Sequence, residues 1–358
     1  STGSDADITV QGSSSNITGG TNGLEIDTVG ADILVQNLGS VTGNAGNGLD
    51  LDSSDGAITV SAVDTILGTG GKGILANSAG GDISIQGSGI VGGVTGTNGA
   101  GIFADATGGA GSINIGGISA NGNVTSTTSD GIYAVASGGG ITVDTTDGSV
   151  SGYTSGVSTE DLTGAVAITT ADVESTKNDG TGIIADSGNG LTIDTTAGSV
   201  NSMFRGILAR DFGTGDISVT TADVTAGTSN GIFARAENGS VTIDSSAGAV
   251  TGSSSGILAF LPGTGNVAIT ADDVTGSTNG ISSRNVGGGT TVINLTSTAD
   301  VVGTTGRGIY ADSTGSDADI TVQGSSSNIT GGTNGLEIDT VGADILVQNL
   351  GSVTGNAG

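Results

Sequence analysis

A glycine followed by an aliphatic residue recurs along the whole chain at intervals of 24 to 30 residues, and twelve such intervals sum to 312 residues. The glycines of this series are Gly23, Gly48, Gly73, Gly101, Gly131, Gly156, Gly182, Gly206, Gly231, Gly256, Gly280, Gly308 and Gly335. A period of roughly 20 to 50 residues is the sequence signature of repeat architectures, in which each period is one unit stacked on its neighbours. The sequence therefore predicts a solenoid whose turns are about 25 residues long.

Each period carries three short β-strand signals separated by clusters of Gly, Ser, Asn and Thr. The first follows the glycine, as in residues 206–210, the second is an alternating triplet such as Ile8 to Val10, and the third is a lone aliphatic residue such as Val250. Alternation predicts strands with one buried face, and no long stretch shows the 3.6-residue period of a helix. We therefore expect an all-β fold, a right-handed parallel β-helix, because parallel crossovers almost always take that hand.

A longer repeat is superimposed on these turns. Residues 1–46 recur without a single change at residues 313–358. We interpret residues 1–358 as one continuous solenoid, residues 1–312 as one long repeat unit, and residues 313–358 as the start of the next identical unit. Chance does not produce such an identity, so we expect the chain to be a slice of a larger array whose units are nearly identical.

Composition and charge exclude several classes of function. The chain has 71 Gly among 358 residues, but 34% of the residues are hydrophobic, enough for a core if the pattern is regular. Its formal net charge of −28 is repelled by phosphate backbones, and aromatic residues, at 2%, are too few to stack bases, so we expect no nucleic-acid partner. No apolar run approaches the length of about 18 residues that spans a membrane, so we expect no direct membrane insertion.

Aligning the turns on the glycines converts the sequence into columns. The residue one after the glycine is always aliphatic, and the residue three after it is mostly Ala, so both positions are predicted to point inward. The position between them should point outward, yet eight of its residues are large and apolar. This apolar stripe comprises Leu75, Phe103, Tyr133, Ile184, Leu208, Phe233, Leu258 and Tyr310. Two interpretations stay open: each side chain covers its neighbour on the surface, or the stripe packs laterally against another chain.

The column four residues after the glycine carries charge. Asp186 and Arg210, and likewise Arg284 and Asp312, are predicted to form ion pairs between turns, each worth at most about 1 kcal/mol. Two like charges, Asp27 and Asp52, would lie side by side. They are weak candidates for binding Ca²⁺, against the simpler reading of solvated carboxylates, because the calcium-binding nonapeptide repeat is absent.

The residue types needed for common catalytic sites are missing. The chain has no His and no Cys, which excludes a Ser-His-Asp triad, the usual zinc sites and thiol chemistry. Carboxylate pairs of the glycosidase kind remain compatible with the abundant Asp, but no turn departs from the repeat toward a cluster of acid, base and cation. We expect no enzymatic activity and no cofactor other than the possible Ca²⁺.

An outward threonine column suggests a further alternative, since Thr-x-Thr ladders on flat β-helical faces bind ice. The column here is single, and Asn114 and Ala167 interrupt it, which disfavours this function. Its threonines are Thr9, Thr59, Thr142, Thr192 and Thr242.

The regular recurrence of Gly-Ile-x-Ala, Asp-Ile-Thr-Val and Val-x-Gly segments resembles the sequences of the β-helical passenger regions of bacterial autotransporters and filamentous-haemagglutinin-type exoproteins. The resemblance implies export across an outer membrane, a bacterial extracellular or cell-surface location, and a role in adhesion or in a biofilm matrix. The lack of Cys is similar to those passengers, which cross the membrane unfolded. The family's C-terminal membrane barrel and N-terminal secretion region are not found in this sequence, so the secretion route stays open.

Two functions follow as hypotheses. The first is a structural segment of a secreted, tandem-repeat bacterial surface or extracellular fibre, whose partners are copies of itself joined laterally or end to end. The alternative is the rigid stalk of a cell-surface adhesin that presents a separate binding tip to other cells or to surface glycans.

Overall fold

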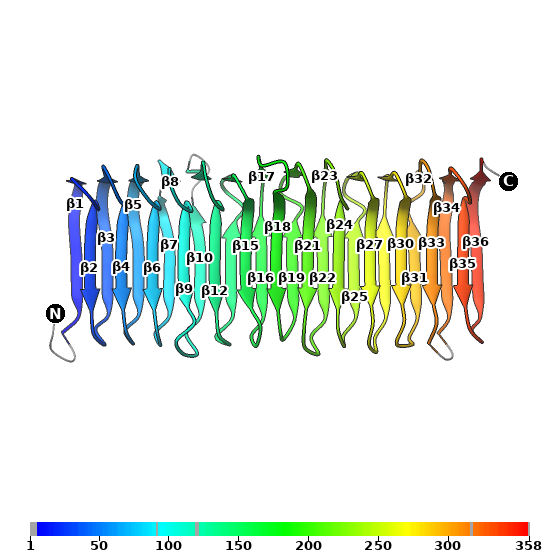
Figure 1. Cartoon of the computed structure of the whole chain (residues 1–358), viewed down its shortest axis with the longest axis horizontal. Helices are drawn as coiled ribbons and strands as arrows, with labels where there is room; N and C mark the ends of the chain where they lie inside the picture. The colour runs from blue at the N-terminus through cyan, green and yellow to red at the C-terminus, as the bar shows by residue number, and fades with distance from the viewer. Residues whose placement is uncertain (1–5, 91, 119–121, 316–317, 357–358) are drawn as a thin grey trace. The chain divides into compact units, whose positions relative to one another are not determined.

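The computed structural model of the chain describes residues 6–90, 92–118, 122–315 and 318–356. These residues form parallel β-strands and no helix, and the strands are stacked as a β-solenoid of about 14 turns with roughly 25 residues in each turn (Figure 1). The fold class and the turn length predicted from the glycine series are therefore confirmed. Within the described residues no helix is long and apolar enough to cross a membrane.

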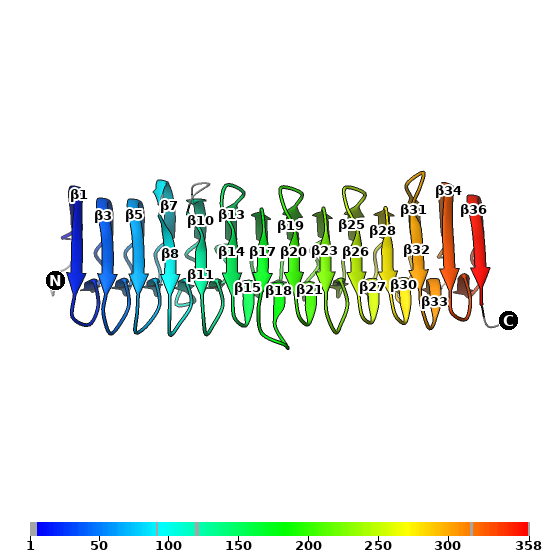
Figure 2. The same cartoon turned by 90° about the horizontal axis from the view of Figure 1, so that it is seen from above.

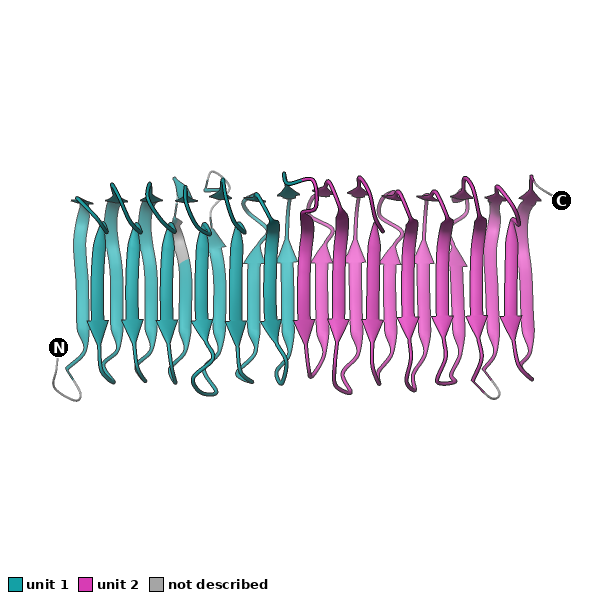
Figure 3. Cartoon of the chain, viewed as in Figure 1, with its two compact units in different colours: residues 1–177 teal, residues 178–358 magenta. Residues whose placement is uncertain are grey.

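The chain divides into two compact units, residues 1–177 and residues 178–358 (Figure 3). This division does not coincide with the 312-residue sequence repeat, whose second copy lies inside unit 2. Each unit is built in the same way, from one sheet of glycine-led strands and one sheet that contains the remaining strands of each turn.

In unit 1 the glycine-led strands pair in parallel, each with the next turn. They are β2 (Leu24–Thr28), β4 (Leu49–Ser53), β6 (Ile74–Ser78), β9 (Ile102–Ala106), β12 (Ile132–Ala136) and β15 (Ser155–Asp161). The other sheet of this unit contains β1 (Ile8–Gly19), β3 (Ile33–Gly43), β5 (Ile58–Gly68), β7 (Ile83–Ile90), β8 (Gly93–Gly96), β10 (Ile113–Ile118), β11 (Val124–Ser126), β13 (Ile141–Thr145), β14 (Val150–Gly152), β16 (Val166–Thr170) and β17 (Val173–Ser175). Figure 2 shows the strands of this second sheet as a row.

Unit 2 repeats the arrangement. Its glycine-led strands are β18 (Thr181–Ser187), β21 (Arg205–Asp211), β24 (Ile232–Ala236), β27 (Ser255–Leu261), β30 (Asn279–Asn285), β33 (Arg307–Ser313) and β35 (Leu336–Thr340). Its second sheet contains β19 (Leu191–Thr195), β20 (Val200–Ser202), β22 (Ile217–Thr221), β23 (Val224–Ala226), β25 (Val241–Ser245), β26 (Val250–Gly252), β28 (Val267–Ala271), β29 (Val274–Gly276), β31 (Thr291–Leu295), β32 (Asp300–Gly303), β34 (Ile320–Gly331) and β36 (Ile345–Gly355).

The prediction of three short strands in every turn is wrong for five turns. There the alternating triplet and the lone aliphatic residue belong to one strand of 11 or 12 residues, namely β1, β3, β5, β34 or β36. Each of these strands contains one non-glycine residue with a positive φ, such as Asn37 at 54° or Ser14 at 60°. A single left-handed residue bends the backbone while the pairing on both sides of it continues, so no loop separates the two segments.

The core is formed by the predicted inward columns. In the turn that begins at Gly206, Ile207 and Ala209 of the first strand and Val224 of the third strand all have an exposed fraction of 0%. The glycine itself is required for space. At Gly231, an added Cβ would lie 2.6 Å from Cγ1 of Val250 and 2.7 Å from the carbonyl oxygen of Gly256, closer than real Cβ contacts. The glycine thus lets the first strand and the third strand of a turn approach each other directly.

We predict that Gly231→Ala lowers the free energy of unfolding by about 1–3 kcal/mol, the usual cost of overpacking a rigid interior. The matched control is Gly20→Ala, because a Cβ there meets nothing within 4 Å. Chemical denaturation followed by circular dichroism compares the two variants with the parent. Equal losses in both variants would contradict the assignment of a packing role to the repeat glycine.

Candidate interaction face

The apolar stripe lies in register on the outward side of the glycine-led strands in unit 1. Leu75 pairs with Phe103, and Phe103 pairs with Tyr133. The three side chains are half-buried, whereas their strand neighbours are buried in the core. The rings of Phe103 and Tyr133 stack with centroids 5.2 Å apart, and Nζ of Lys72 lies 4.8 Å from the Phe103 centroid. Surface stacking, the first of the two interpretations, is therefore found at this pair.

In unit 2 the stripe runs through four consecutive pairing partners and is then interrupted. Ile184, Leu208, Phe233 and Leu258 are aligned in turn, after which Ser282 takes the position before Tyr310. Leu208 is 8% exposed and the other large members are half-buried. The predicted register of the apolar stripe is thus correct, but its side chains are not fully exposed. Among the described residues the exposed large apolar side chains, such as Leu162 and Met203, lie outside the stripe.

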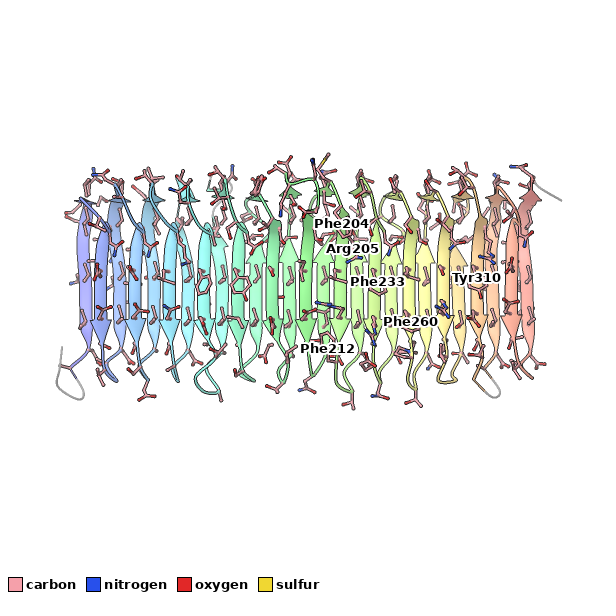
Figure 4. The ribbon with its side chains drawn as sticks, in the orientation of Figure 1. Phe204, Arg205, Phe212, Phe233, Phe260 and Tyr310 are labelled. Atoms are coloured by element: carbon pink, nitrogen blue, oxygen red, sulfur yellow. The ribbon has the colours of Figure 1, made fainter. Side chains whose placement is uncertain are left out.

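Arginine side chains cover two members of the stripe in unit 2, Phe233 and Tyr310. All five arginines of the chain lie in unit 2, and each guanidinium lies over at least one aromatic ring. Figure 4 labels Arg205 and five of the aromatic residues. Arg205 lies 5.2 Å from the Phe204 centroid and 5.4 Å from that of Phe233, and Arg307 lies 4.5 Å from that of Tyr310. The remaining contacts are Arg210 on Phe212, and Arg235 and Arg284 on Phe260. Each such contact contributes about 0.5–1 kcal/mol at an exposed site.

Sequence reasoning missed this basic and aromatic face. The arginines belong to the column immediately before the glycine, for which no prediction is made from the sequence, and to the column four residues after it, for which only ion pairs are predicted. The available signal was a basic residue just before the glycine of one turn, such as Arg205, together with an aromatic residue in the stripe of the next turn, here Phe233. Arg205 lies three residues before the position opposite Phe233, and its long side chain spans that distance.

Both ion pairs predicted between turns are present. Arg210 binds Asp186 with two hydrogen bonds, of 2.7 Å from Nε and 2.6 Å from one terminal amino group. The contact of Arg284 with Asp312 is longer, with Nε of Arg284 3.5 Å from a carboxylate oxygen of Asp312. A further ion pair joins Nε of Arg307 to Glu337 at 2.7 Å, and the interaction with Arg307 lowers the pKa of the Glu337 carboxyl.

Arg205 differs from the other arginines because no acidic partner of its guanidinium is found among the described residues. Its Nε, like those of Arg235 and Arg307, is buried without a hydrogen-bond partner. Burial lowers the pKa of its guanidinium, and the charge of Arg210 lowers it further. The group nevertheless remains charged at neutral pH, because an arginine is not deprotonated in proteins. The face therefore presents positive charge on a chain that is acidic as a whole.

The acidic turns of unit 1 form the opposite kind of surface. Asp27 pairs directly with Asp52, as predicted, and Glu25 pairs with Asp50. The amide nitrogen of Asn22 donates hydrogen bonds of 2.7 Å to Glu25 and 2.8 Å to Asp50. Burial raises the pKa of Asp50, and the neighbouring carboxylates add to that rise, while a hydrogen bond from the Asn47 side chain opposes it.

The described part of the chain contains no group of three or more His, Cys, Asp or Glu side chains placed to hold a metal ion. Ca²⁺ binding by Asp27 and Asp52 therefore stays a prediction. The amide groups of Asn22 and Asn77 already hydrogen-bond carboxylates of these turns, with Asn77 donating to Asp52 at 2.5 Å.

Two cavities lie beside these columns of charged and aromatic residues. In unit 1, a polar cavity of about 340 Å³ is lined by Asp52, Asn77 and Asp105 together with small residues. In unit 2, a cavity of about 370 Å³ opens on the basic and aromatic face. Its lining residues are Phe233, Ser254, Ser255, Leu258, Phe260, Thr278, Asn279, Ser282, Arg284, Arg307 and Tyr310.

Comparison of the chain with protein-family models, with curated proteins and with solved structures finds no match. The class defined by the fold is the parallel β-solenoid, and the face just described is its most distinctive surface feature.

The raised pKa of Asp50 leads to a prediction about pH. Because the folded state binds the proton more tightly than the unfolded state, ionised Asp50 reduces stability at neutral pH, and this penalty vanishes as the pH falls through the folded pKa toward the ordinary value of 3.8. We expect Asp50→Asn to increase the free energy of unfolding at pH 7 by less than about 1 kcal/mol, with a smaller gain near pH 4.

Denaturant titrations at the two pH values measure this difference. Asp64→Asn is the matched control, since Asp64 is exposed and its side chain is not among the hydrogen-bonded groups of the acidic turns. A gain at pH 4 as large as that at pH 7, or an equal gain in the control, would show that the ionisation of Asp50 in its half-buried site is not the cause.

Proposed function

We propose that the chain is a structural segment of a secreted, tandem-repeat bacterial surface or extracellular fibre that self-associates laterally or end to end. The observation that carries the proposal is that residues 1–46 recur unchanged at residues 313–358 and that the described parts of both copies form equivalent strands. In the first copy, Ile33, Val35 and Val41 are at most 1% exposed, because turns stack on both sides of them.

This coverage arises from stacking. Strand β3 pairs with β1 on one side and with β5 on the other, and its copy β36 pairs in the same register with β34. In an array of such units each turn supplies ladder hydrogen bonds to its neighbours and buries their aliphatic side chains. Full burial of each such side chain contributes about 1.5–3 kcal/mol. Units that repeat the same surface can be stacked in series, because each turn contacts only its neighbours.

The biological setting in this proposal rests on the resemblance to autotransporter and haemagglutinin-type passengers. Secretion, a cell-surface or extracellular location and a role in adhesion or a biofilm matrix are consistent with a cysteine-free, acidic solenoid. Repetition supports a structural role as well, because each turn offers its neighbours nearly the same surface.

One observation favours the alternative of a rigid adhesin stalk. The arginines of unit 2 cover part of the apolar stripe within the chain itself, for example Arg205 over Phe233. A stripe that is already half-buried needs a lateral partner less than an open one does. A stalk would remain a single rod and would carry its binding function on a separate tip.

A triple variant distinguishes the two functions. We expect Phe103→Asp, Tyr133→Asp and Phe233→Asp together to abolish lateral bundling, because three desolvated carboxylates would replace half-buried rings at the stripe. The matched control places the same three charges on the other sheet, at the exposed positions of Thr142, Thr192 and Thr242. Negative-stain microscopy and light scattering report filament width and assembly.

Circular dichroism first establishes that both variants keep the β-solenoid. Bundles of normal width in the stripe variant would exclude the stripe as the lateral interface. A parent chain that sediments as single rods at all concentrations would favour the stalk over the fibre.

A further inference from the structure

We propose that the cavity on the basic and aromatic face of unit 2 is a binding site for an acidic oligosaccharide, one whose sugar rings bear carboxylates. This inference goes beyond the fibre function and does not depend on self-association. The cavity, of about 370 Å³, falls within the usual range for small-ligand sites. All of its lining residues belong to unit 2.

The cavity exists because one position of the apolar stripe is small. Ser282 pairs with Leu258 on one side and with Tyr310 on the other. Of the four consecutive stripe positions 233, 258, 282 and 310, only position 282 has a small residue. Ser282 is 3% exposed and forms the floor, while the larger neighbours form walls on both sides. The notch is therefore set by the sequence of a single turn.

An unpartnered acceptor lies within the cavity lining. Asn279 is 8% exposed, and its Oδ1 atom has no hydrogen-bond partner. In an earlier turn the equivalent Asn230 uses its Oδ1 to accept a hydrogen bond from the backbone N–H of Ser255. Above Asn279, however, the N–H of Arg307 donates to the carbonyl of Thr278. A buried polar atom without a partner is unfavourable, so a rotation of the Asn279 side chain that brings Oδ1 to a ligand hydroxyl would be favoured.

One charged group of the cavity is available to an anion, namely Arg284, because Arg307 is paired with Glu337. Arg284 is half-exposed, and its ion-pair contact is the 3.5 Å approach of Nε to Asp312, longer than a charge-assisted hydrogen bond. Among the described residues no hydrogen-bond partner is found for its two terminal amino groups. The planar fork of a guanidinium matches a carboxylate with two parallel hydrogen bonds.

The rings supply the remaining element of the site. Phe260 lies beneath Arg284, at 5.5 Å from the guanidinium to the ring centroid, and Tyr310 lies beneath Arg307, at 4.5 Å. Aromatic walls with a few convergent polar groups are typical of small-ligand sites. Carboxylate, hydroxyl groups and an apolar ring face occur together in a uronic acid sugar, which therefore fits the guanidinium and the aromatic walls of this cavity.

Isothermal titration calorimetry on the full chain at low salt tests the site with tetragalacturonate as the probe. We expect binding that weakens with added salt, and that is at least tenfold weaker in Ser282→Leu and in Arg284→Gln. Ser282→Leu fills the notch with the residue that the preceding turn already accommodates at Leu258. Arg210→Gln is the control on the same face, since Arg210 is engaged by Asp186 outside the cavity, and it should bind as the parent does.

Two further probes decide the chemistry. Maltotetraose has the rings without the charge, and tetraglutamate has the charge without the rings; we expect each to bind at least tenfold more weakly than tetragalacturonate. No binding of tetragalacturonate, equal binding of either other probe, or unchanged binding in Ser282→Leu would overturn the proposal. Since Ser282→Leu keeps the apolar stripe, it should still assemble, so loss of sugar binding and loss of assembly are separate results.

Discussion

The structure depends on the close approach, at the repeat glycine, of the glycine-led strand and the last segment of the second sheet in the same turn. In unit 2 a Cβ at Gly231 would clash with Val250 of the same turn and with the backbone of Gly256 in the next. This contact fixes the position of the glycine-led strand against the second sheet, and it recurs at Gly206, Gly256 and Gly280. The columns of buried, outward and charged residues follow from it, because each turn repeats the same offset. Stability then comes from neighbouring turns rather than from any turn alone.

The sequence period was sufficient to predict the class of fold, the inward columns and the ion pairs between turns. These features depend only on which residues occupy equivalent positions, as with Asp186 and Arg210. The bends inside the long strands could not be predicted, since a left-handed conformation at Ala62 or Ser14 has no distinctive residue type. The contacts of arginine with aromatic rings were also missed, because they join different columns and depend on side-chain rotamers that the period does not specify.

Because the buried positions are nearly the same in every turn, differences in function between turns depend on the outward columns. Ile207, Ile232 and Ile257 are interchangeable in their surroundings, each with an exposed fraction of 0%. The outward positions of the same strands differ from turn to turn, as Leu258, Ser282 and Tyr310 show. A change there alters the surface without a penalty in the core, which is how one scaffold can hold an acidic surface in unit 1 and a basic, aromatic one in unit 2. The proposed sugar site shows how one outward residue can change the surface, because the small side chain of Ser282 creates the notch.

The two routes to self-association differ in strength for physical reasons. Stacking one turn onto another pairs a complete backbone ladder and buries aliphatic side chains, as it does at Ile33 and Val41 of β3. Lateral contact through the stripe gains less, because Leu208 is already buried and arginines lie over Phe233 and Tyr310. The net charge of −28 opposes the approach of two chains, and lateral contact has less burial to offset that repulsion. Growth along the axis should therefore precede bundling, and salt, which screens repulsion between chains, should promote bundling more than growth.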